Sequence, residues 1–260
     1  MYATERQQMI EELVSSAGRV AVVDLARRFG VTTETVRRDL GQLEAVGSVR
    51  RVHGGAVALS RVSTVESSVA ERSERRREAK VSIARRALEA LPSGFDGSIY
   101  LDAGTTTAAL AQLLIERGPA HRPLEVVTHS MTIAHVLAGS AGLSLTAIGG
   151  RVRGLTAAAV GSHTVDAISR LRPDIAFIGT NGLSAAFGLS TPDPDEAAVK
   201  RAIVAASRRC VVLADADKLE AELLVSFARL DDADVLVTDG SLSRSLADAV
   251  DAADMEVWQA

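Results

Sequence analysis

The chain has 260 residues, of which 47% are hydrophobic and 24% charged, so a mostly disordered protein is excluded and two domains are expected. No apolar run reaches the ~18–20 residues of a membrane span, and the single cysteine, Cys210, excludes an intramolecular disulfide framework and a cysteine-cluster metal site. The net charge of −4 is unevenly divided, because residues 1–80 carry 14 Lys and Arg against 11 Asp and Glu, whereas residues 81–260 carry 15 against 22. A mildly basic N-terminal part on an acidic body is typical of a DNA-binding head carried by another domain.

Residue usage is skewed as well. The chain has 26 Arg but only three Lys (Lys80, Lys200 and Lys218) and a single Asn, Asn181. Because an ammonium is a compact point charge that a guanidinium does not replace, we expect the remaining Lys and Asn at positions where no other residue serves, with chance survival as the alternative. The charged N-terminal residues MYATERQQMIEEL are unlike a signal peptide, so we expect a soluble cytoplasmic protein, with Cys210 as a small buried hydrophobe.

Three helices are predicted in the first 47 residues. Apolar residues at helical spacing indicate a first helix that ends at Gly18, and a second helix covers residues 24–29 after an extended piece at residues 20–22. Thr32 is placed to cap the third helix. The inward-facing stripe of that third helix consists of Val36, Leu40 and Leu43. Helix, short helix, tight turn and third helix together predict a helix-turn-helix.

The outer face of the third helix and the segment after it carry the candidate DNA contacts. The run SVRRVHGGAVAL alternates apolar and basic residues around a glycine pair, which predicts a β-hairpin wing. Basic and hydroxyl side chains on such a helix and wing reach phosphates and base edges. The alternatives are a solvated helix face and, for the histidine of the wing, an ordinary turn residue. The residues that we predict to contact DNA are Thr33, Thr35, Arg37, Arg38, Gln42, Arg50, Arg51 and His53.

The run DLARRFGVTTETVRRDLGQLEAVGSVRRVHGGA resembles the winged-helix head of the DeoR-type (DeoR/GlpR family) bacterial transcriptional regulators. VRRDL, the LE–G pair and RVHGGA occur in order and at tight spacing, and the resemblance continues through most of the chain. We therefore expect a winged helix-turn-helix DNA-binding domain at residues 1–58. A linker is expected at residues 59–80, where the polar run 71–80 is a solvated connector or the first exposed turns of a helix, and an effector-binding domain at residues 81–260.

Beyond residue 98, short apolar runs alternate with helical segments, which predicts βαβ units, a mostly parallel sheet and an α/β fold. Strands are expected at residues 99–101, 124–128, 143–148, 175–178, 210–214, 235–237 and 255–258. Helices are expected near residues 105–117, 131–139, 161–171, 193–207 and 242–252. In such sheets ligands bind at the carboxyl ends of the strands, so polar residues that follow strands are candidates for a site.

The run LDAGTTTAAL contains the first of these candidates. Asp102 ends a strand, Gly104 allows a tight turn, and Thr105, Thr106 and Thr107 open a helix. Backbone amides at a helix start together with three hydroxyls predict a cradle for a phosphate, with ordinary threonine capping as the alternative. No Gly-Lys-Ser/Thr follows, so this is not a Walker A loop and no ATP hydrolysis is expected.

Five more clusters complete the candidate effector site, and four of them also follow strands. They lie in VVTHS, IGGRVRG, FIGTNG, DEAAVKR and LADADKL, and their candidate residues are Thr128, His129, Ser130, Gly149, Gly150, Arg151, Gly179, Asn181, Glu196, Lys200, Asp215 and Lys218. The spacing of Glu196 and Lys200, four residues apart on one helix, also fits a plain surface ion pair. Hydroxyls, glycine amides, lysines and carboxylates on one rim suit a phosphorylated sugar or polyol.

The body also resembles the effector domain of DeoR-type regulators, which is similar in fold to ribose-5-phosphate isomerase and binds phosphorylated sugars. The positions that match are Asp102, Gly104, Thr105, Thr106, Thr128, Ser130, Gly149, Gly150, Glu196, Lys200, Asp215 and Lys218. His129 departs from the pattern, since the family usually has Asn there, and an imidazole at this position would make ligand affinity depend on pH near its pKa.

Two functions of different class follow. The first is a DNA-binding regulator, by resemblance a repressor of sugar-utilisation genes, whose partners are an operator duplex, a phosphorylated sugar and further copies of itself as a dimer or tetramer. This hypothesis needs no cofactor, metal, membrane or enzymatic activity. The alternative is a sugar-phosphate isomerase in which Asp102, Glu196 or Asp215 transfers a proton beside Lys200. A winged helix has no use in an isomerase, which favours the regulator.

Overall fold

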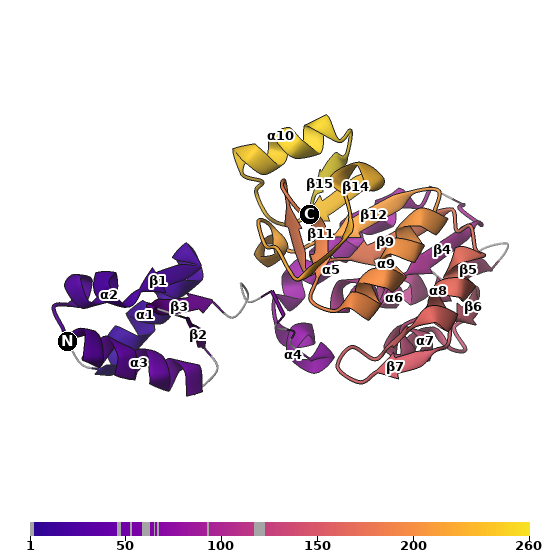
Figure 1. Ribbon diagram of the computed structural model, residues 1–260. Coiled ribbons are helices and arrows are strands. Elements are labelled where there is room, and N and C mark those ends of the chain that lie inside the picture. The colour runs from indigo at the N-terminus through magenta and orange to yellow at the C-terminus, as the bar shows by residue number, and fades with distance from the viewer. Residues whose placement is uncertain are drawn as a thin grey trace. The chain divides into compact units, whose positions relative to one another are not determined.

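The computed structural model describes residues 3–45, 48–52, 54–58, 63–64, 66, 68–92, 94–116 and 123–260. The chain divides into two compact units, of which the first ends at Val65 and the second runs from Glu66 to Ala260 (Figure 1). The division falls inside the linker that we expected at residues 59–80. The later part of that expected linker therefore belongs to the second unit.

Unit 1 consists of three helices and a small antiparallel sheet. The helices are α1 (Ala3–Ala17), α2 (Val22–Phe29) and α3 (Thr33–Ala45). The strands β1 (Arg19–Ala21), β2 (Val49–Val52) and β3 (Gly55–Ala58) pair in the order β1-β3-β2. The core is formed mainly by one face of each helix and includes Ile10, Val14, Leu25, Val36, Leu40 and Leu43. The predicted helix-turn-helix and the apolar stripe of its third helix are confirmed.

The turn between α2 and α3 follows from two residues. Gly30 adopts a left-handed conformation with φ 64° and donates its N–H to the carbonyl oxygen of Ala26, which ends α2. The Oγ1 atom of Thr32 accepts the N–H of Thr35 at 3.2 Å and so caps α3 as predicted. One boundary was predicted wrongly: Val22 begins α2 instead of ending an extended piece, because its side chain is buried against the helical core.

Unit 2 is built on a seven-stranded parallel sheet with the spatial order β15-β14-β12-β9-β4-β5-β6. The strands are β4 (Ser98–Leu101), β5 (Leu124–Thr128), β6 (Leu143–Ala147), β9 (Ile175–Gly179), β12 (Cys210–Leu213), β14 (Val235–Thr238) and β15 (Glu256–Gln259). Each of them overlaps one of the seven strands predicted from the sequence. The α/β class of the body is thereby confirmed.

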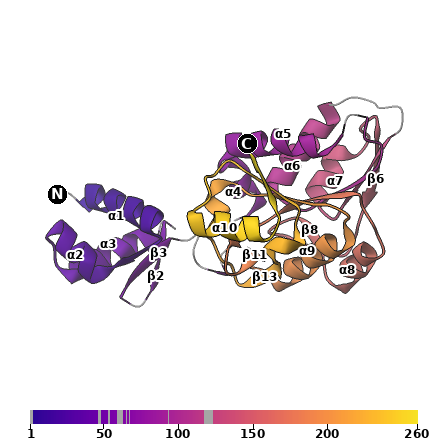
Figure 2. The ribbon, with the colours of Figure 1, turned by 90° about the horizontal axis from the view of Figure 1, so that it is seen from above.

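Helices cover both faces of this sheet. Figure 2 shows α5 (Arg77–Ala87), α6 (Thr105–Glu116) and α7 (Met131–Leu137) on one side and α8 (Ser162–Ser169) and α9 (Pro194–Ala206) on the other. The alternation of strand side chains explains the two layers. Ile99 and Leu101 belong to the hydrophobic cluster that contains α5, α6 and α7, whereas Tyr100 belongs to the cluster that contains α8, α9 and α10 (Arg244–Ala252). The strands are therefore buried on both faces, as their continuous apolar runs predict.

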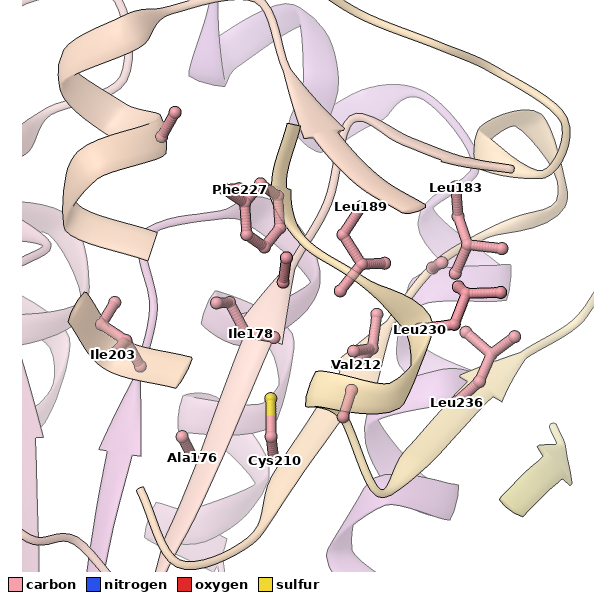
Figure 3. Packing of buried hydrophobic residues seen from close by; sticks show 14 of the residues in the cluster. Ala176, Ile178, Leu183, Leu189, Ile203, Cys210, Val212, Phe227, Leu230 and Leu236 are labelled. Carbon is pink, nitrogen blue, oxygen red and sulfur yellow. The ribbon is translucent and has the colours of Figure 1, made fainter. Parts of the chain in front are cut away.

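A second, smaller sheet was not predicted. It contains β10 (Gly182–Ser184), β11 (Gly188–Thr191) and β13 (Val225–Ala228) in antiparallel order. Figure 3 shows Leu189 and Phe227 of this sheet packed against Ile178, Val212 and Leu236 of the parallel sheet. The segments GLS, GLST and VSFA mix apolar residues with glycine, serine and threonine, so they lack the bulky apolar runs that marked the strands of the parallel sheet. The same holds for the hairpin β7 (Arg151–Arg153) and β8 (Ala158–Val160).

The segment before the sheet is helical rather than a plain connector. Ser68 and Glu71 form a reciprocal capping box at the start of α4 (Val69–Glu74), and α5 begins at Arg77, inside the polar run 71–80. Cys210 is buried, as predicted, and burial raises the pKa of its thiol. Within the described ranges, no helix has both the length and the apolar character to cross a membrane.

Candidate DNA-binding face and effector site

The candidate DNA contacts of unit 1 lie on α3 and on the neighbouring strand β2. Thr33, Arg37, Arg38 and Gln42 are exposed along α3, and Thr35 is half-buried with its hydroxyl 2.9 Å from that of Thr32. Nη1 of Arg37 lies 3.4 Å from Oε2 of Glu34, and the side chain of Gln42 accepts a hydrogen bond from the side chain of Gln7. Arg38 makes no hydrogen bond or ion pair with any residue that the structure describes, so its guanidinium is available to a phosphate or a base.

The hairpin is fastened to α3 at the basic residues. The backbone N–H of Arg51 donates to Oε1 of Glu44 on α3 at 2.9 Å. The Arg51 guanidinium lies over Gly41, where an added Cβ would be 3.7 Å from Nη1. Arg50 and Arg51 are exposed on β2, so they extend the basic surface of α3. His53, the remaining predicted contact, lies outside the described residues.

A buried ion pair that we did not predict from the sequence holds α3 against α1. Arg6 donates to both carboxylate oxygens of Asp39 at 2.6 and 3.1 Å, and Asp39 is 1% exposed. The hydrogen bonds that Arg6 donates to Asp39 raise the pKa of the Arg6 guanidinium above its ordinary value. A charged residue on the inward side of an amphipathic helix is a signal for such a buried partner. The pair orients the outer face of α3.

In unit 2 the strand order reverses between β4 and β9. From β4 the chain proceeds outward through β5 and β6, and from β9 it proceeds the other way through β12, β14 and β15. Open α/β sheets bind ligands in the crevice at this kind of switch point, at the carboxyl ends of the strands. Asp102 follows β4 and Gly179 ends β9, so two predicted site residues flank the switch point.

Asp102, Gly179 and Lys200 form a buried polar centre there. Oδ2 of Asp102 accepts the N–H of Gly179 at 2.9 Å and also bonds the ammonium of Lys200. Lys200 donates in addition to the carbonyl oxygen of Gly179 at 2.8 Å and lies 5.5 Å from the ring centroid of Phe227. The second carboxylate oxygen, Oδ1, is buried and has no hydrogen-bond partner among the described residues. A donor from a ligand would satisfy it.

The alternative of a surface ion pair between Glu196 and Lys200 is wrong. Both residues are buried on the same face of α9, but they bond different partners. Oε1 of Glu196 accepts from Arg153 at 2.9 Å and from the hydroxyl of Thr156 at 2.5 Å. Spacing along a helix brings these two side chains near each other. Because both are buried, however, each charged group needs several hydrogen-bond partners, and it finds them on other elements of the fold.

His129 lies beside this centre in a chain of three polar side chains. Its Nδ1 is 3.1 Å from the hydroxyl of Tyr100, and its Nε2 is 3.7 Å from Oδ1 of Asp102. Burial lowers the pKa of His129 to about 4, against the opposing pull of Asp102, and burial also raises the pKa of Tyr100. The imidazole is therefore neutral near pH 7, so the pH dependence suggested for it does not fall in the physiological range.

The three threonines of the predicted phosphate cradle differ in their surroundings. Thr107 is fully buried and donates its hydroxyl to the carbonyl oxygen of Gly104 at 3.0 Å, so it shapes the turn and presents no free hydroxyl. Thr105 is partly exposed and Thr106 is 9% exposed at the start of α6. The N-terminus of a twelve-residue helix thus faces the carboxyl edge of the sheet with two of the three hydroxyls uncommitted among the described residues.

The other predicted residues at this edge serve turns and caps. Thr128 donates to the carbonyl oxygen of Leu101 at 2.7 Å, and the side chain of Ser130 caps α7. The carbonyl oxygen of Gly149 accepts from Thr164, and a Cβ on Gly150 would lie 2.0 Å from the same hydroxyl, which explains the glycine. Two further side chains have protein partners: Arg151 is exposed and pairs with Asp195, and Asn181 accepts from Thr191.

Asp215 and Lys218 lie at the end of β12. Asp215 caps the short helix η3 (Ala216–Lys218) by accepting the N–H of Asp217 at 3.1 Å. Burial lowers the pKa of Lys218, and the charge of Asp215 opposes this shift. The Lys218 ammonium forms no hydrogen bond or ion pair within the part of the chain that the structure describes. The Lys218 ammonium is therefore available to donate hydrogen bonds to an anion bound at this edge.

Several residues of the site were missed or undervalued by the sequence analysis. Asp239 follows β14 and would have been found by the same strand-end rule, which we applied to only five strands. Tyr100 has no such signal, because it reads as an ordinary strand residue. Arg153 stands in IGGRVRG, but only the fold brings it to Glu196. Among the described residues, no group of three or more His, Cys, Asp and Glu side chains is placed to hold a metal ion.

Comparison with known proteins agrees with both units. Residues 6–62 match the DeoR-like helix-turn-helix domain, and residues 75–240 match the DeoR C terminal sensor domain. The chain is 34% identical over 257 residues to the HTH-type transcriptional regulator GlpR of Haloferax volcanii, covering 99% of this chain and 98% of that protein. It is 31% identical over 239 residues to the glycerol-3-phosphate regulon repressor of Escherichia coli K12, with 92% of each chain covered.

Among solved structures, ribose 5-phosphate isomerase A from Neisseria gonorrhoeae aligns with a TM-score of 0.40 and 16% identity over 55% of this chain and 53% of that one. A likeness of this size carries no argument about function. The two domain matches and the full-length relatives do decide the family. The chain belongs to the DeoR family of HTH-type transcriptional regulators, with a DNA-binding helix-turn-helix domain followed by a sensor domain.

Proposed function

We propose that this regulator is a cytoplasmic repressor of sugar-utilisation genes and that a phosphorylated sugar or polyol, bound at the carboxyl edge of the parallel sheet, relieves repression. The names of two relatives, a glycerol-3-phosphate regulon repressor and a putative aga operon transcriptional repressor, support repression as the mode of action. Two half-sites on a duplex require two heads, so we also propose that the chain acts as a dimer or a tetramer.

One observation carries the effector proposal. The carboxyl edge of one sheet holds a buried carboxylate oxygen with no donor, Oδ1 of Asp102, and an ammonium with no acceptor, that of Lys218, both counted within the described residues. A sugar hydroxyl donates to the first and a phosphate accepts from the second. The amides at the start of α6 are a further place for the phosphate. A neutral sugar would leave Lys218 unpaired.

The proposal for DNA rests on the exposed side chains of α3 and β2. Arg38 and Arg50 are exposed cations that make no hydrogen bond or ion pair with any described residue, and they lie on a helix and a strand that are side by side, so they are free to neutralise phosphates. Thr33 and Gln42 supply hydroxyl and amide groups that suit base edges or the sugar-phosphate backbone. We assign base reading to the N-terminal half of α3 and backbone contact to the hairpin.

We propose a sensor rather than an enzyme, although the buried pair of Asp102 and Lys200 is also the kind of group that transfers protons. The relatives are transcriptional regulators, which supports the sensor. Incubating the purified chain with ribose 5-phosphate and assaying for ketose separates the two. Steady turnover that disappears in Asp102→Asn would contradict the sensor proposal and show that the chain is an isomerase.

The main test is fluorescence anisotropy of labelled DNA from upstream of the protein's own gene, at one salt concentration. The panel contains glycerol 3-phosphate, fructose 1-phosphate, fructose 6-phosphate and glucose 6-phosphate, each beside its unphosphorylated counterpart. We expect tight binding that one phosphorylated compound releases and its counterpart does not. Binding that none of a broad set of sugar phosphates alters would contradict the effector proposal, and genomic fragments with no affinity above random DNA would contradict the operator proposal.

Variants assign the two activities to their sites. Arg38→Ala should weaken DNA binding at least about tenfold, the cost of one good base or phosphate contact, and leave sugar-phosphate binding intact. Arg85→Ala, which removes an arginine from α5 in unit 2 that is also exposed, is the matched control and should bind DNA like the wild type. Lys218→Met should keep DNA binding and lose the response to the phosphorylated compound.

A further inference from the structure

We propose that Arg153 is the positioning residue that connects the effector site to the segment leading out of the DNA-binding unit. This rests on the proposed function, because it concerns how an occupied site changes the rest of the chain. The segment in question consists of Glu66 and residues 68–80, and we call it the junction segment. One of its ends shares Arg153 with the candidate effector residue Glu196, and its other end is anchored elsewhere on the same sheet edge.

Two buried carboxylates compete for the Arg153 guanidinium. Nη1 of Arg153 lies 2.5 Å from Oε2 of Glu66 and 2.9 Å from Oε1 of Glu196, and the Glu66 side chain is 3% exposed. Nε of Arg153 is held separately by Asp193 at 3.0 Å. One nitrogen therefore serves both the first residue of unit 2 and a residue of the effector site.

Neither carboxylate has the Arg153 guanidinium to itself in this arrangement. Burial raises the pKa of Glu66, and the charge of Glu196 raises it further, while Arg153 and Arg72 oppose both effects. The second oxygen of Glu66, Oε1, is buried without a hydrogen bond among the described residues, and its neighbouring cation, Arg72, is 3.7 Å away. Glu66 is thus held by a single strong contact that Glu196 weakens.

The other end of the junction segment is anchored firmly. Between α4 and α5, Arg76 adopts a left-handed conformation with φ 53°, which costs a non-glycine residue stability unless its surroundings hold it. Asp217 accepts from Arg75 at 2.8 Å and from Arg76 at 3.0 Å, and Arg76 also pairs with Asp239.

Lys80 adds to this anchor. Its ammonium bonds the carbonyl oxygens of Arg72 and Arg75, which are left free at the end of α4, and the distance to the second is 2.5 Å. Asp239 also accepts the N–H of Ala216 at 2.9 Å and so ties the anchor to the end of β12. Because this end has several independent bonds, a change at Arg153 is expressed at the Glu66 end.

The direction of the effect follows from charge. A ligand hydroxyl that donates to Glu196 satisfies part of its negative charge and leaves Arg153 more fully to Glu66, which tightens the junction segment. Loss of Arg153 leaves Glu66 without that contact and loosens it. A ligand that binds Glu196 therefore favours one state of the residues that follow the DNA-binding unit, as coupling between sites requires.

Hydrogen–deuterium exchange of the full-length chain, without ligand or DNA, tests this directly. Glu196→Gln imitates a satisfied Glu196 and should slow amide exchange in peptides covering residues 68–74 by about threefold or more. Asp195→Asn, which neutralises the neighbouring exposed carboxylate on α9, is the matched control and should leave that exchange unchanged. Unchanged or faster exchange in Glu196→Gln overturns the proposal.

Two further variants keep the test independent of folding defects. Arg153→Met should speed exchange at residues 68–74, whereas Arg229→Met, which removes an exposed cation elsewhere, should not. Glu66→Gln removes one of the two charges that compete for Arg153, so in that background Glu196→Gln should have no further effect. A full Glu196→Gln effect in the Glu66→Gln background would show that it does not pass through Arg153.

A last measurement separates this proposal from the proposed function. The sugar phosphate that releases DNA in the anisotropy test should slow exchange at residues 68–74 as Glu196→Gln does. If no sugar phosphate alters DNA binding while the variants behave as stated, the effector proposal fails and the role of Arg153 stands. If a sugar phosphate releases DNA but leaves this exchange unchanged, the signal takes another path and the role of Arg153 fails.

Discussion

At the scale of single residues, unit 2 concentrates buried polar groups at its switch point. Asp102 is fully buried and Lys200 is 4% exposed, so each charge depends on the other for compensation. A buried ion pair is not by itself strongly stabilising, but removing one partner leaves an uncompensated charge. A single substitution in this pair therefore measures the cost of an uncompensated buried charge, whereas a double substitution measures the net contribution of the whole pair.

Lys200→Met should lower the free energy of unfolding of unit 2 by about 3–5 kcal/mol, because Asp102 then stays buried without its cation. Asp102→Asn together with Lys200→Met should recover most of that loss. Urea unfolding followed by the fluorescence of Trp258, the single tryptophan, measures unit 2. A double variant as unstable as Lys200→Met would contradict the assignment of these two side chains as one pair.

His129 should make unit 2 less stable in mild acid. Its pKa is lowered to about 4 in the folded chain, below the ordinary value near 6.5, so between these two values the unfolded chain binds the extra proton. Stability is then full above pH 6.5 and falls as the pH drops toward 4, by about 2 kcal/mol at pH 5 from this group alone. The measurement compares urea unfolding of the wild type and His129→Asn at pH 7 and pH 5. An equal pH dependence in both proteins would contradict the neutral, buried imidazole.

At the scale of elements, the small sheet of unit 1 requires a close approach between strand β3 of the hairpin and strand β1. A Cβ at Gly55 would lie 2.0 Å from the carbonyl oxygen of Val20, so β3 pairs with β1 only because position 55 has no side chain. The hairpin in turn places Arg50 and Arg51 beside α3. The second glycine of the RVHGGA run is thus explained by packing between strands rather than by a turn angle.

Gly55→Ala should lower the stability of unit 1 by about 1–3 kcal/mol, the usual cost of forcing an extra methyl into a packed site. Gly41→Ala is the control: the added Cβ meets only ordinary contact at 3.7 Å, and alanine favours a helix interior by up to about 1 kcal/mol. Backbone amide exchange of unit 1 in the full chain reports both. A Gly55→Ala chain as stable as the wild type would show that β1 and β3 are not so closely paired.

At the scale of the whole molecule, the two surfaces that we propose for DNA and for the effector belong to different compact units. Each unit has its own hydrophobic core, and the charged residues that we assign to DNA and to the effector lie in different units. Regulation then requires a coupling free energy between the two sites, and such a coupling is reciprocal. The junction segment is the part of unit 2 that follows unit 1 directly along the chain.

Reciprocity gives a quantitative expectation. If a sugar phosphate weakens operator binding by some factor, the operator must weaken binding of that sugar phosphate by the same factor. Calorimetric titration of the sugar phosphate into the free protein and into the protein–DNA complex measures the second factor, and anisotropy measures the first. Unequal factors would mean that a further equilibrium, such as a change of oligomeric state, accompanies binding.

Local patterns were enough to place every strand of the large sheet and the helix-turn-helix, because those elements depend on periodicity and on punctuation by glycine and threonine. Strand ends likewise indicated the edge that carries Asp102 and Lys218, since parallel strands share their carboxyl side, whereas Lys200 was a candidate on a helix. The partner of each charge depended on the tertiary fold instead. Glu196 bonds Arg153, which is 43 positions away in the sequence, rather than Lys200. Arg76 bonds Asp217 and Asp239, which are both more than 140 positions away. Such pairings leave no trace in local spacing, because they are selected by the cost of burying a charge where the chain happens to pack.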